Sequence, residues 1–171
     1  MAIARSSRDD LRAKAYRGLG EIAFEAQRFD EAGQQYQAAL RFYPERKPDP
    51  LVVYRIGACL QALGQWDAAR PYFQRVLETG PAGDPLVQRA LIRRDARGFA
   101  LQFGAYGSPA NANEELGHLK TLGIISGVVV PELQEGTMLY MVRAGLYRTF
   151  AEASAARAAM ITKFPQVRVV P

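Results

Sequence analysis

A pattern of residues that recurs after 37 positions is the feature of this sequence that most constrains its fold. Within each copy, apolar residues return at intervals of three and four, which is the period of one face of an α-helix. Each copy also carries a turn between two such segments, so each predicts a helix–turn–helix unit. The paired positions are Tyr16 and Val53, Leu19 and Ile56, Gly20 and Gly57, Phe29 and Trp66, Asp30 and Asp67, Ala32 and Ala69, Tyr36 and Phe73, and Pro44 and Pro81.

The small and polar members of this pattern have expected structural roles. The paired glycines and alanines are expected where two helices approach closely, because larger side chains would hold the helices apart. Asp30 and Asp67 are expected to cap the second helix of each unit by accepting a backbone N–H. Pro44 and Pro81 are expected to end those helices, since proline has no N–H to continue the hydrogen-bond ladder.

Two Asp-Pro pairs mark further helix starts. In Asp49-Pro50 and again in Asp84-Pro85, the aspartate suits the N-cap position and the proline suits the first helical position. The second pair predicts a fifth helix over residues 86–95. Because two repeats bury little apolar surface by themselves, we expect this helix to cap the stack.

After Arg97 the helical period stops and short apolar runs begin. Their order predicts a βαββαβ arrangement: a four-stranded antiparallel sheet with strands 1 and 3 in the middle and both helices on one face. A repeat at offset 41, Gly104-x-Tyr106 and Gly145-x-Tyr147, supports two equivalent halves. The sequence thus predicts an α+β protein with a helical repeat array over 1–97 and a sheet domain over 98–171. The expected strands are 99–106, 124–130, 138–144 and 167–170, and the expected helices are 112–122 and 150–163.

Strand alternation predicts which residues of the two central strands lie on the open face of the sheet. Leu101 and Phe103 are the best core candidates of the first strand, so Gln102 and Gly104 are expected to point outward and to be exposed. The offset of 41 makes Arg143 the equivalent of Gln102. The outward residues expected on the third strand are Leu139, Met141 and Arg143.

An amide and a guanidinium among apolar side chains suit a sugar chain, because they donate to hydroxyl and acetamido groups while apolar patches contact ring faces. The sequence allows two interpretations of Gln102 and Arg143. They contact a ligand, or they are solvated strand residues that bind nothing. RNA suits this face less well, because sheets of this topology that bind RNA place aromatic residues on the central strands for base stacking.

Composition narrows the class of function. The formal net charge is +5, with 22 Lys and Arg against 17 Asp and Glu spread along the chain, so no nucleic-acid partner is expected. The single cysteine, Cys59, is expected in the core, and the single histidine, His118, on the surface. We therefore expect no catalytic site, no metal and no cofactor. No apolar run approaches the roughly 18 residues of a membrane span, and a membrane association is expected only through a segment that this chain lacks.

Residues 13–81 resemble tetratricopeptide (TPR) repeats, whose usual period is about 34 residues. The eight pairs of positions related by the offset of 37 carry the resemblance, and the three extra residues fit the loop between the two copies. The resemblance implies stacked helical hairpins with a groove that binds a protein partner, whose identity the sequence does not give.

Residues 98–171 resemble a SPOR domain. The motifs that carry the resemblance are Phe-Ala-Leu-Gln-Phe-Gly-Ala-Tyr at 99–106, Leu-Tyr-Met-Val-Arg-Ala-Gly-Leu-Tyr at 139–147, and Glu152-Ala153 in the last helix. The resemblance implies binding of peptidoglycan, with a preference for glycan strands stripped of stem peptides, at the open sheet face. Met141 departs from the family, which carries an arginine there, and Leu139 replaces an aromatic residue of some members. The implied glycan-binding residues are Gln102, Gly104, Ala105, Leu139, Met141 and Arg143.

Together these patterns predict a non-enzymatic protein of the bacterial cell envelope, in the periplasm and associated with cell division. It would bind glycan strands through the sheet and a protein through the helical array. The alternative is a scaffold or assembly component in which the SPOR-like sheet has become a protein contact surface.

Overall fold

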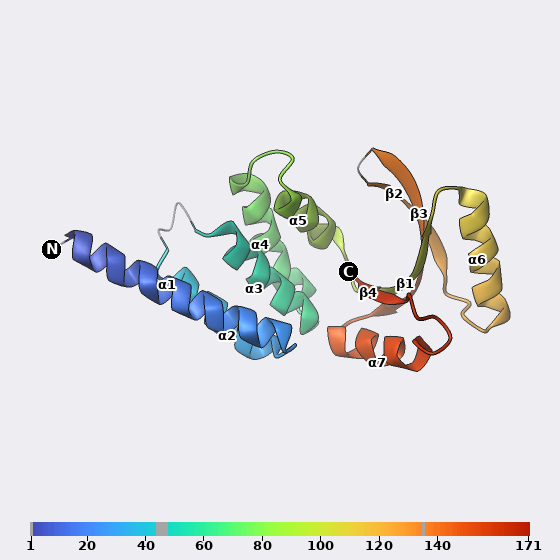
Figure 1. Ribbon diagram of the computed structural model, residues 1–171, viewed down its shortest axis with the longest axis horizontal. Coiled ribbons are helices and arrows are strands. Elements are labelled where there is room, and N and C mark those ends of the chain that lie inside the picture. The colour runs from blue at the N-terminus through green and yellow to red at the C-terminus, as the bar shows by residue number, and fades with distance from the viewer. Residues whose placement is uncertain (1, 44–47, 135) are drawn as a thin grey trace. The chain divides into compact units, whose positions relative to one another are not determined.

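The computed structural model describes residues 2–43, 48–134 and 136–171, and over these residues it has seven helices and one four-stranded antiparallel sheet (Figure 1). The predicted α+β class is therefore confirmed. The chain divides into two compact units, Met1–Arg97 and Gly98–Pro171. The first unit is helical, and the second contains the whole sheet.

The first unit is a series of antiparallel helical hairpins. Each helix packs against the next along the chain, as stacked helix–turn–helix units require. The helices are α1 (Ala2–Glu25), α2 (Phe29–Leu40), α3 (Pro50–Ala62), α4 (Trp66–Thr79) and α5 (Pro85–Asp95).

An equivalent contact between a glycine and an aromatic ring lies within each of the two hairpins. A Cβ added at Gly20 of α1 would lie 2.7 Å from the ring of Tyr36 of α2, and one added at Gly57 of α3 would lie 2.9 Å from the ring of Phe73 of α4. Both rings are completely buried. The offset of 37 relates the two glycines and the two aromatic residues, so the sequence repeat is also a repeat of packing.

The two Asp-Pro pairs cap their helices as predicted. Asp49 accepts a hydrogen bond from the backbone N–H of Leu51 at 2.9 Å, and Asp84 accepts one from Leu86 at 2.7 Å. Each proline occupies the first turn of its helix, where its missing N–H breaks no intrahelical bond.

The predicted caps of α2 and α4 are wrong. The N-cap residues are Arg28 and Gln65, and neither makes a side-chain cap hydrogen bond. Both helices begin one residue before the aspartate, so Asp30 and Asp67 lie inside the first turn, where a carboxylate acts on the helix dipole instead. Pro44, expected to end α2, falls outside the described residues.

The second unit has the predicted βαββαβ order, with strand order β2-β3-β1-β4 and antiparallel pairing throughout. The strands predicted as central, β1 and β3, are central. The elements are β1 (Phe99–Tyr106), α6 (Pro109–Thr121), β2 (Val128–Gln134), β3 (Thr137–Tyr147), α7 (Phe150–Met160) and β4 (Arg168–Val170).

Most element boundaries after Phe99–Tyr106 differ from the prediction by one to four residues: β2 begins at Val128 instead of 124, β3 ends at Tyr147 instead of 144, and α7 ends at Met160 instead of 163. Two of the differences have a clear physical cause. The strand expected to stop before Pro131 instead continues through it to Gln134. It is an edge strand of the sheet, where a residue without an N–H can face solvent. The helix expected from residue 112 begins at Pro109, because Ser108 caps it by accepting from the N–H of Asn111.

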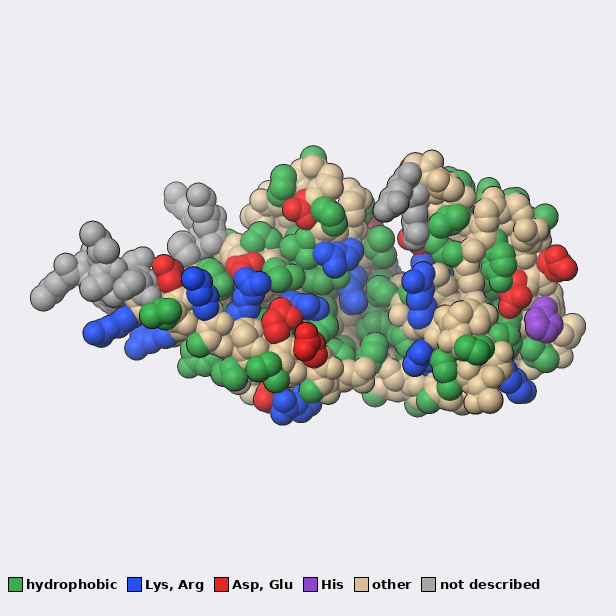
Figure 2. Space-filling model, in the orientation of Figure 1, with side chains coloured by type: hydrophobic (Ala, Val, Ile, Leu, Met, Phe, Trp, Pro, Cys, Tyr) green, Lys and Arg blue, Asp and Glu red, His purple; other side chains and the backbone are tan. Residues whose placement is uncertain are grey.

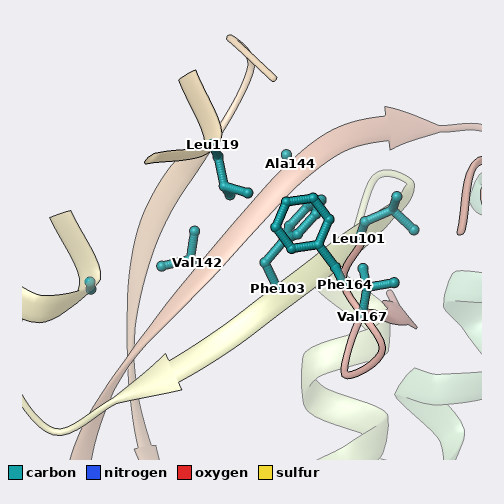
Figure 3. Packing of buried hydrophobic residues seen from close by; sticks show 8 residues of the cluster. Leu101, Phe103, Leu119, Val142, Ala144, Phe164 and Val167 are labelled. Carbon is teal, nitrogen blue, oxygen red and sulfur yellow. The ribbon is translucent and has the colours of Figure 1, made fainter. Parts of the chain in front are cut away.

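A single apolar core joins the sheet to both helices of this unit (Figure 3). Phe103 meets the ring of Phe164 edge-on, with centroids 5.1 Å apart. Since residues of α6 and α7 both pack into this one core, the two helices cover the same face of the sheet. The opposite face carries no helix of this unit. The buried core residues are Leu101, Phe103, Ala112, Leu119, Val142, Ala144, Phe164 and Val167.

Candidate functional site

The strand register identifies the side chains on the helix-free face. Gln102 of β1 lies opposite Arg143 of β3, and Ala105 lies opposite Met141. Residues paired across antiparallel strands point to the same side of the sheet. Because the core residues Leu101 and Val142 neighbour these positions along their strands, the paired residues point away from the core.

A bulge in β1 reverses the alternation predicted for Gly104. The register shifts between Gln102 and Gly104, so that Phe103 and Gly104 together face the single residue Val142. Gly104 therefore lies on the helix-covered side, where an added Cβ would be 2.6 Å from the hydroxyl of Tyr106. The prediction that Gly104 lies on the open face is wrong.

The same bulge turns Ala105 toward the open face, where it is exposed. Because alternation resumes one residue later, Tyr106 points to the helix side and packs against the core. Burial, and after it the nearby Glu115 carboxylate, raise the pKa of Tyr106. Tyr106 is thus a packing residue.

Arg143 connects three strands across the open face. Its Nε donates to Oε1 of Gln102 on β1 at 3.2 Å, and its Nη2 donates to Oε2 of Glu132 on β2 at 2.7 Å. Glu132 lies opposite Leu139, two residues before Met141 on β3, whereas Arg143 lies two residues after it. The two side chains therefore meet at the level of the Val130–Met141 pair, which lies between them in the register.

The neighbours of Arg143 on this face are buried, in agreement with such a bridge. Met141 is 0% exposed and Gln102 is 3% exposed, although both were expected to be exposed on the open face. The prediction that these two side chains point away from the core is correct, but the prediction that they are exposed to solvent is wrong. Arg143 and Glu132 retain exposed side-chain fractions of 19% and 26%, and Leu139 is half-buried.

Glu132 is the residue of this face that the sequence prediction missed. Ending the strand before Pro131 removed it from consideration. Alternation from Val128 through Val130 to Glu132 would have placed all three on one side, and the register puts them opposite Arg143, Met141 and Leu139. The alternation of residues would have identified Glu132 if the strand had been predicted to continue through Pro131, as an edge strand can.

Cys59 and His118 lie where the sequence predicted them, in the core and on the surface. Cys59 is buried in the helical core, and burial raises its pKa to about 12, so its thiol is unreactive near neutral pH. His118 is exposed on α6, 3.9 Å from Glu115. No group of three or more His, Cys, Asp or Glu within the described residues could hold a metal ion.

The first unit carries an arginine-rich concavity of about 610 Å³ between α4 and the end of α5. Asp95 pairs with Arg94 through both carboxylate oxygens, at 2.8 and 2.9 Å. Elsewhere Figure 2 shows basic and acidic side chains interspersed along the visible face of the helices. The residues that line the concavity are Arg70, Pro71, Gln74, Arg94, Asp95 and Arg97.

The chain combines a helical-hairpin array with an antiparallel sheet that has a polar centre on its open face. A tetratricopeptide repeat model matches residues 23–92, and a SPOR domain model matches residues 95–164. The chain therefore carries a TPR-type repeat followed by a SPOR domain, in the predicted order. No curated protein matches the chain.

These families imply a general role. SPOR domains bind peptidoglycan and are typical of bacterial cell-envelope proteins, and TPR repeats bind proteins; both are generally non-catalytic. In the described part of the chain, no helix has both the length and the apolarity needed to cross a bilayer.

Proposed function

We propose that this protein binds the glycan strands of peptidoglycan through the open face of its SPOR sheet while its TPR array holds a protein partner. The observation that carries the proposal is the polar centre of that face. Gln102 and Arg143, the two positions that match the family's glutamine and arginine, are in register on the two central strands and joined by a hydrogen bond.

The chemistry of this centre suits an uncharged polymer of hydroxyl and acetamido groups. The charge of Arg143 is balanced by Glu132, so the pair presents polar donors and acceptors without a net charge. The half-buried Leu139 and the exposed Ala105 flank it with small apolar surfaces. A sugar chain can lie across such a surface with its hydroxyls on the ion pair and its ring faces on the apolar side chains.

Gly104 and Met141 have a different place in this proposal. Gly104 supports the site through the bulge that turns Ala105 outward, and Met141 supports it as a buried neighbour of Arg143 on the same face. Gln102 orients Arg143 from β1. The residues proposed to touch glycan are therefore Arg143, Glu132, Leu139 and Ala105.

The TPR array is proposed to bring a second protein to the wall. Its arginine-lined concavity has one acidic residue, already paired with Arg94, which favours a partner segment with acidic side chains. We place this activity in the periplasm, at division sites where stripped glycan accumulates. The protein acts in this proposal by binding alone, without catalysis, cofactor or nucleic acid.

One observation favours the alternative, in which the sheet face contacts a protein. Val128, on the same face beside Arg143, is 54% exposed, and an exposed aliphatic residue next to a neutral ion pair also suits a protein surface. The two functions differ in whether purified peptidoglycan alone is sufficient for binding.

Co-sedimentation with purified sacculi tests the proposal. The full chain should sediment with amidase-treated sacculi more than with intact sacculi. Ala105→Glu, on the open face, should abolish sedimentation, whereas Ala155→Glu, at an exposed position of α7, should not. Failure of the unsubstituted chain to sediment with either preparation would reject glycan binding and favour the protein-contact function.

A further inference from the structure

Two arginines flank Gln102 on the open face, and their surroundings differ. Gln102 lies opposite Arg143 on one side and opposite Arg168 of β4 on the other. With a strand spacing of about 4.8 Å, the two arginine backbones are roughly 10 Å apart across β1. The register places both side chains on the same face.

Arg143 is not available to a ligand anion. Its Nη2 is 2.7 Å from the Glu132 carboxylate, and the pair is mostly buried, where solvent screens it little. A ligand carboxylate that approached Arg143 would also meet the negative charge of Glu132. The guanidinium can therefore donate hydrogen bonds to neutral groups, but it offers no net positive charge.

Arg168 is available. It is exposed, and throughout the described residues no carboxylate or other acceptor engages its side chain. It thus supplies an unbalanced positive charge directly beside the neutral centre formed by Gln102, Arg143 and Glu132.

We propose that Arg168 forms a carboxylate subsite of the glycan site, an inference that rests on the proposed function. Amide hydrolysis between the lactyl group of the sugar and its stem peptide adds water across the C–N bond. The amine leaves with the peptide, and a carboxylate remains on the sugar. Arg168 takes this carboxylate, while Arg143 and Glu132 contact neutral groups of the same strand. The subsite recognises the group that peptide removal creates.

The test compares strands with free and blocked carboxylates. Amidase-treated sacculi are used as such or after carbodiimide coupling to methylamine, which converts each carboxylate to a neutral amide. The full chain should bind the blocked strands about three- to tenfold more weakly, because it loses one charge-assisted contact at a solvent-exposed site. Raising the ionic strength should weaken binding to the free strands only.

Arg168→Gln is the decisive variant, and Lys163→Gln is its matched control. Both remove one positive charge at an exposed position of the second unit, but Lys163 lies in the segment between α7 and β4, off the sheet. Arg168→Gln should bind free and blocked strands equally, at the level of the original chain on blocked strands. Lys163→Gln should still discriminate, and Arg168→Lys should restore part of the preference.

An Arg168→Gln protein that still prefers free strands by the original factor would overturn the carboxylate subsite while leaving glycan binding intact. So would an original chain that binds free and blocked strands equally. Loss of binding by the unsubstituted chain to both kinds of strand would instead reject the proposed function and the subsite with it.

Discussion

At the scale of single residues, identical residue types on one helix meet different constraints. Gly18 and Gly20 lie two positions apart on α1, yet only Gly20 contacts another helix: a Cβ at Gly18 has no atom within 4 Å, whereas one at Gly20 would collide with Tyr36. Because Tyr36 is completely buried, its ring cannot move aside freely.

Gly20→Ala should therefore destabilise the first unit by about 1–3 kcal/mol through overpacking. Gly18→Ala is the matched control, and it should stabilise by up to about 1 kcal/mol, because alanine is the better helix former. Chemical denaturation of both proteins measures the difference. Similar effects at the two positions would mean that α1 and α2 do not pack through Gly20.

Gln102 illustrates the same dependence on surroundings in the sheet. Gln102→Ala removes the acceptor of Arg143 Nε from a site that is 3% exposed, so we expect a loss of about 1–3 kcal/mol in the unfolding free energy. Gln166→Ala, at an exposed position before β4, should change it by less than about 0.5 kcal/mol. Equal, small changes would show Gln102 to be a solvated strand residue.

Met141→Arg restores the residue that the family resemblance leads one to expect, but position 141 is completely buried in this chain, and we expect Arg143 to cover it. A second guanidinium there has no carboxylate partner and too little room, so we expect a cost of about 1–3 kcal/mol. Met141→Leu, which conserves volume, should cost less than about 1.5 kcal/mol. Thermal melts compare the two; an unchanged Met141→Arg protein would mean that Arg143 does not cover this position.

At the scale of elements, helix starts depend on local sequence, but their stability depends on what else the cap contacts. Among the described residues, the only role of the Asp84 side chain is to cap α5. Asp49 caps α3 and also forms an ion pair with Arg17 of α1, with 2.8 Å between Oδ2 and Nη1. One aspartate therefore fixes a helix end, and the other also joins two helices.

Asp84→Ala should cost about 0.5–2 kcal/mol, the usual range for loss of a cap. Asp49→Ala should cost more, because it also leaves Arg17 without its partner. Asp84→Asn and Asp49→Asn keep a capping oxygen, so only the latter should lose measurable stability. Urea denaturation gives the four values, and an Asp49→Asn protein as stable as Asp84→Asn would exclude a contribution from the Arg17 pair.

At the scale of the whole molecule, each unit has its own core. The core that contains Leu101 draws its buried residues from the second unit alone, and the two helical clusters, one of which contains Phe73, draw theirs from the first. Such an arrangement predicts that a cavity in one core leaves the other largely unaffected.

Leu101→Ala should destabilise the second unit by about 2–5 kcal/mol. Trp66, the one tryptophan of the chain, lies at the start of α4 and reports on the first unit, so its fluorescence transition should not move. Phe73→Ala should shift that transition strongly. A shift caused by Leu101→Ala would show that the units unfold together.

The sequence by itself determined the features that depend on local geometry. Helical period, the Asp49 and Asp84 caps and the order of strands and helices all follow from residues a few positions apart, because backbone geometry sets which neighbours share a face. The βαββαβ order in turn predicted the two central strands. The 37-residue repeat predicted a close approach of helices at Gly20 and Gly57, and the structure shows it against the rings of Tyr36 and Phe73.

Only the tertiary structure decided the composition of the open face. The bulge that turns Gly104 inward, the Arg143 bridge and the burial of Met141 depend on the pairing of segments that are distant in the chain: Arg143 is 41 residues from Gln102 and 11 from Glu132. Alternation predicts the direction in which a side chain leaves its strand. What then covers that side chain is set by the register of neighbouring strands, which no local pattern specifies.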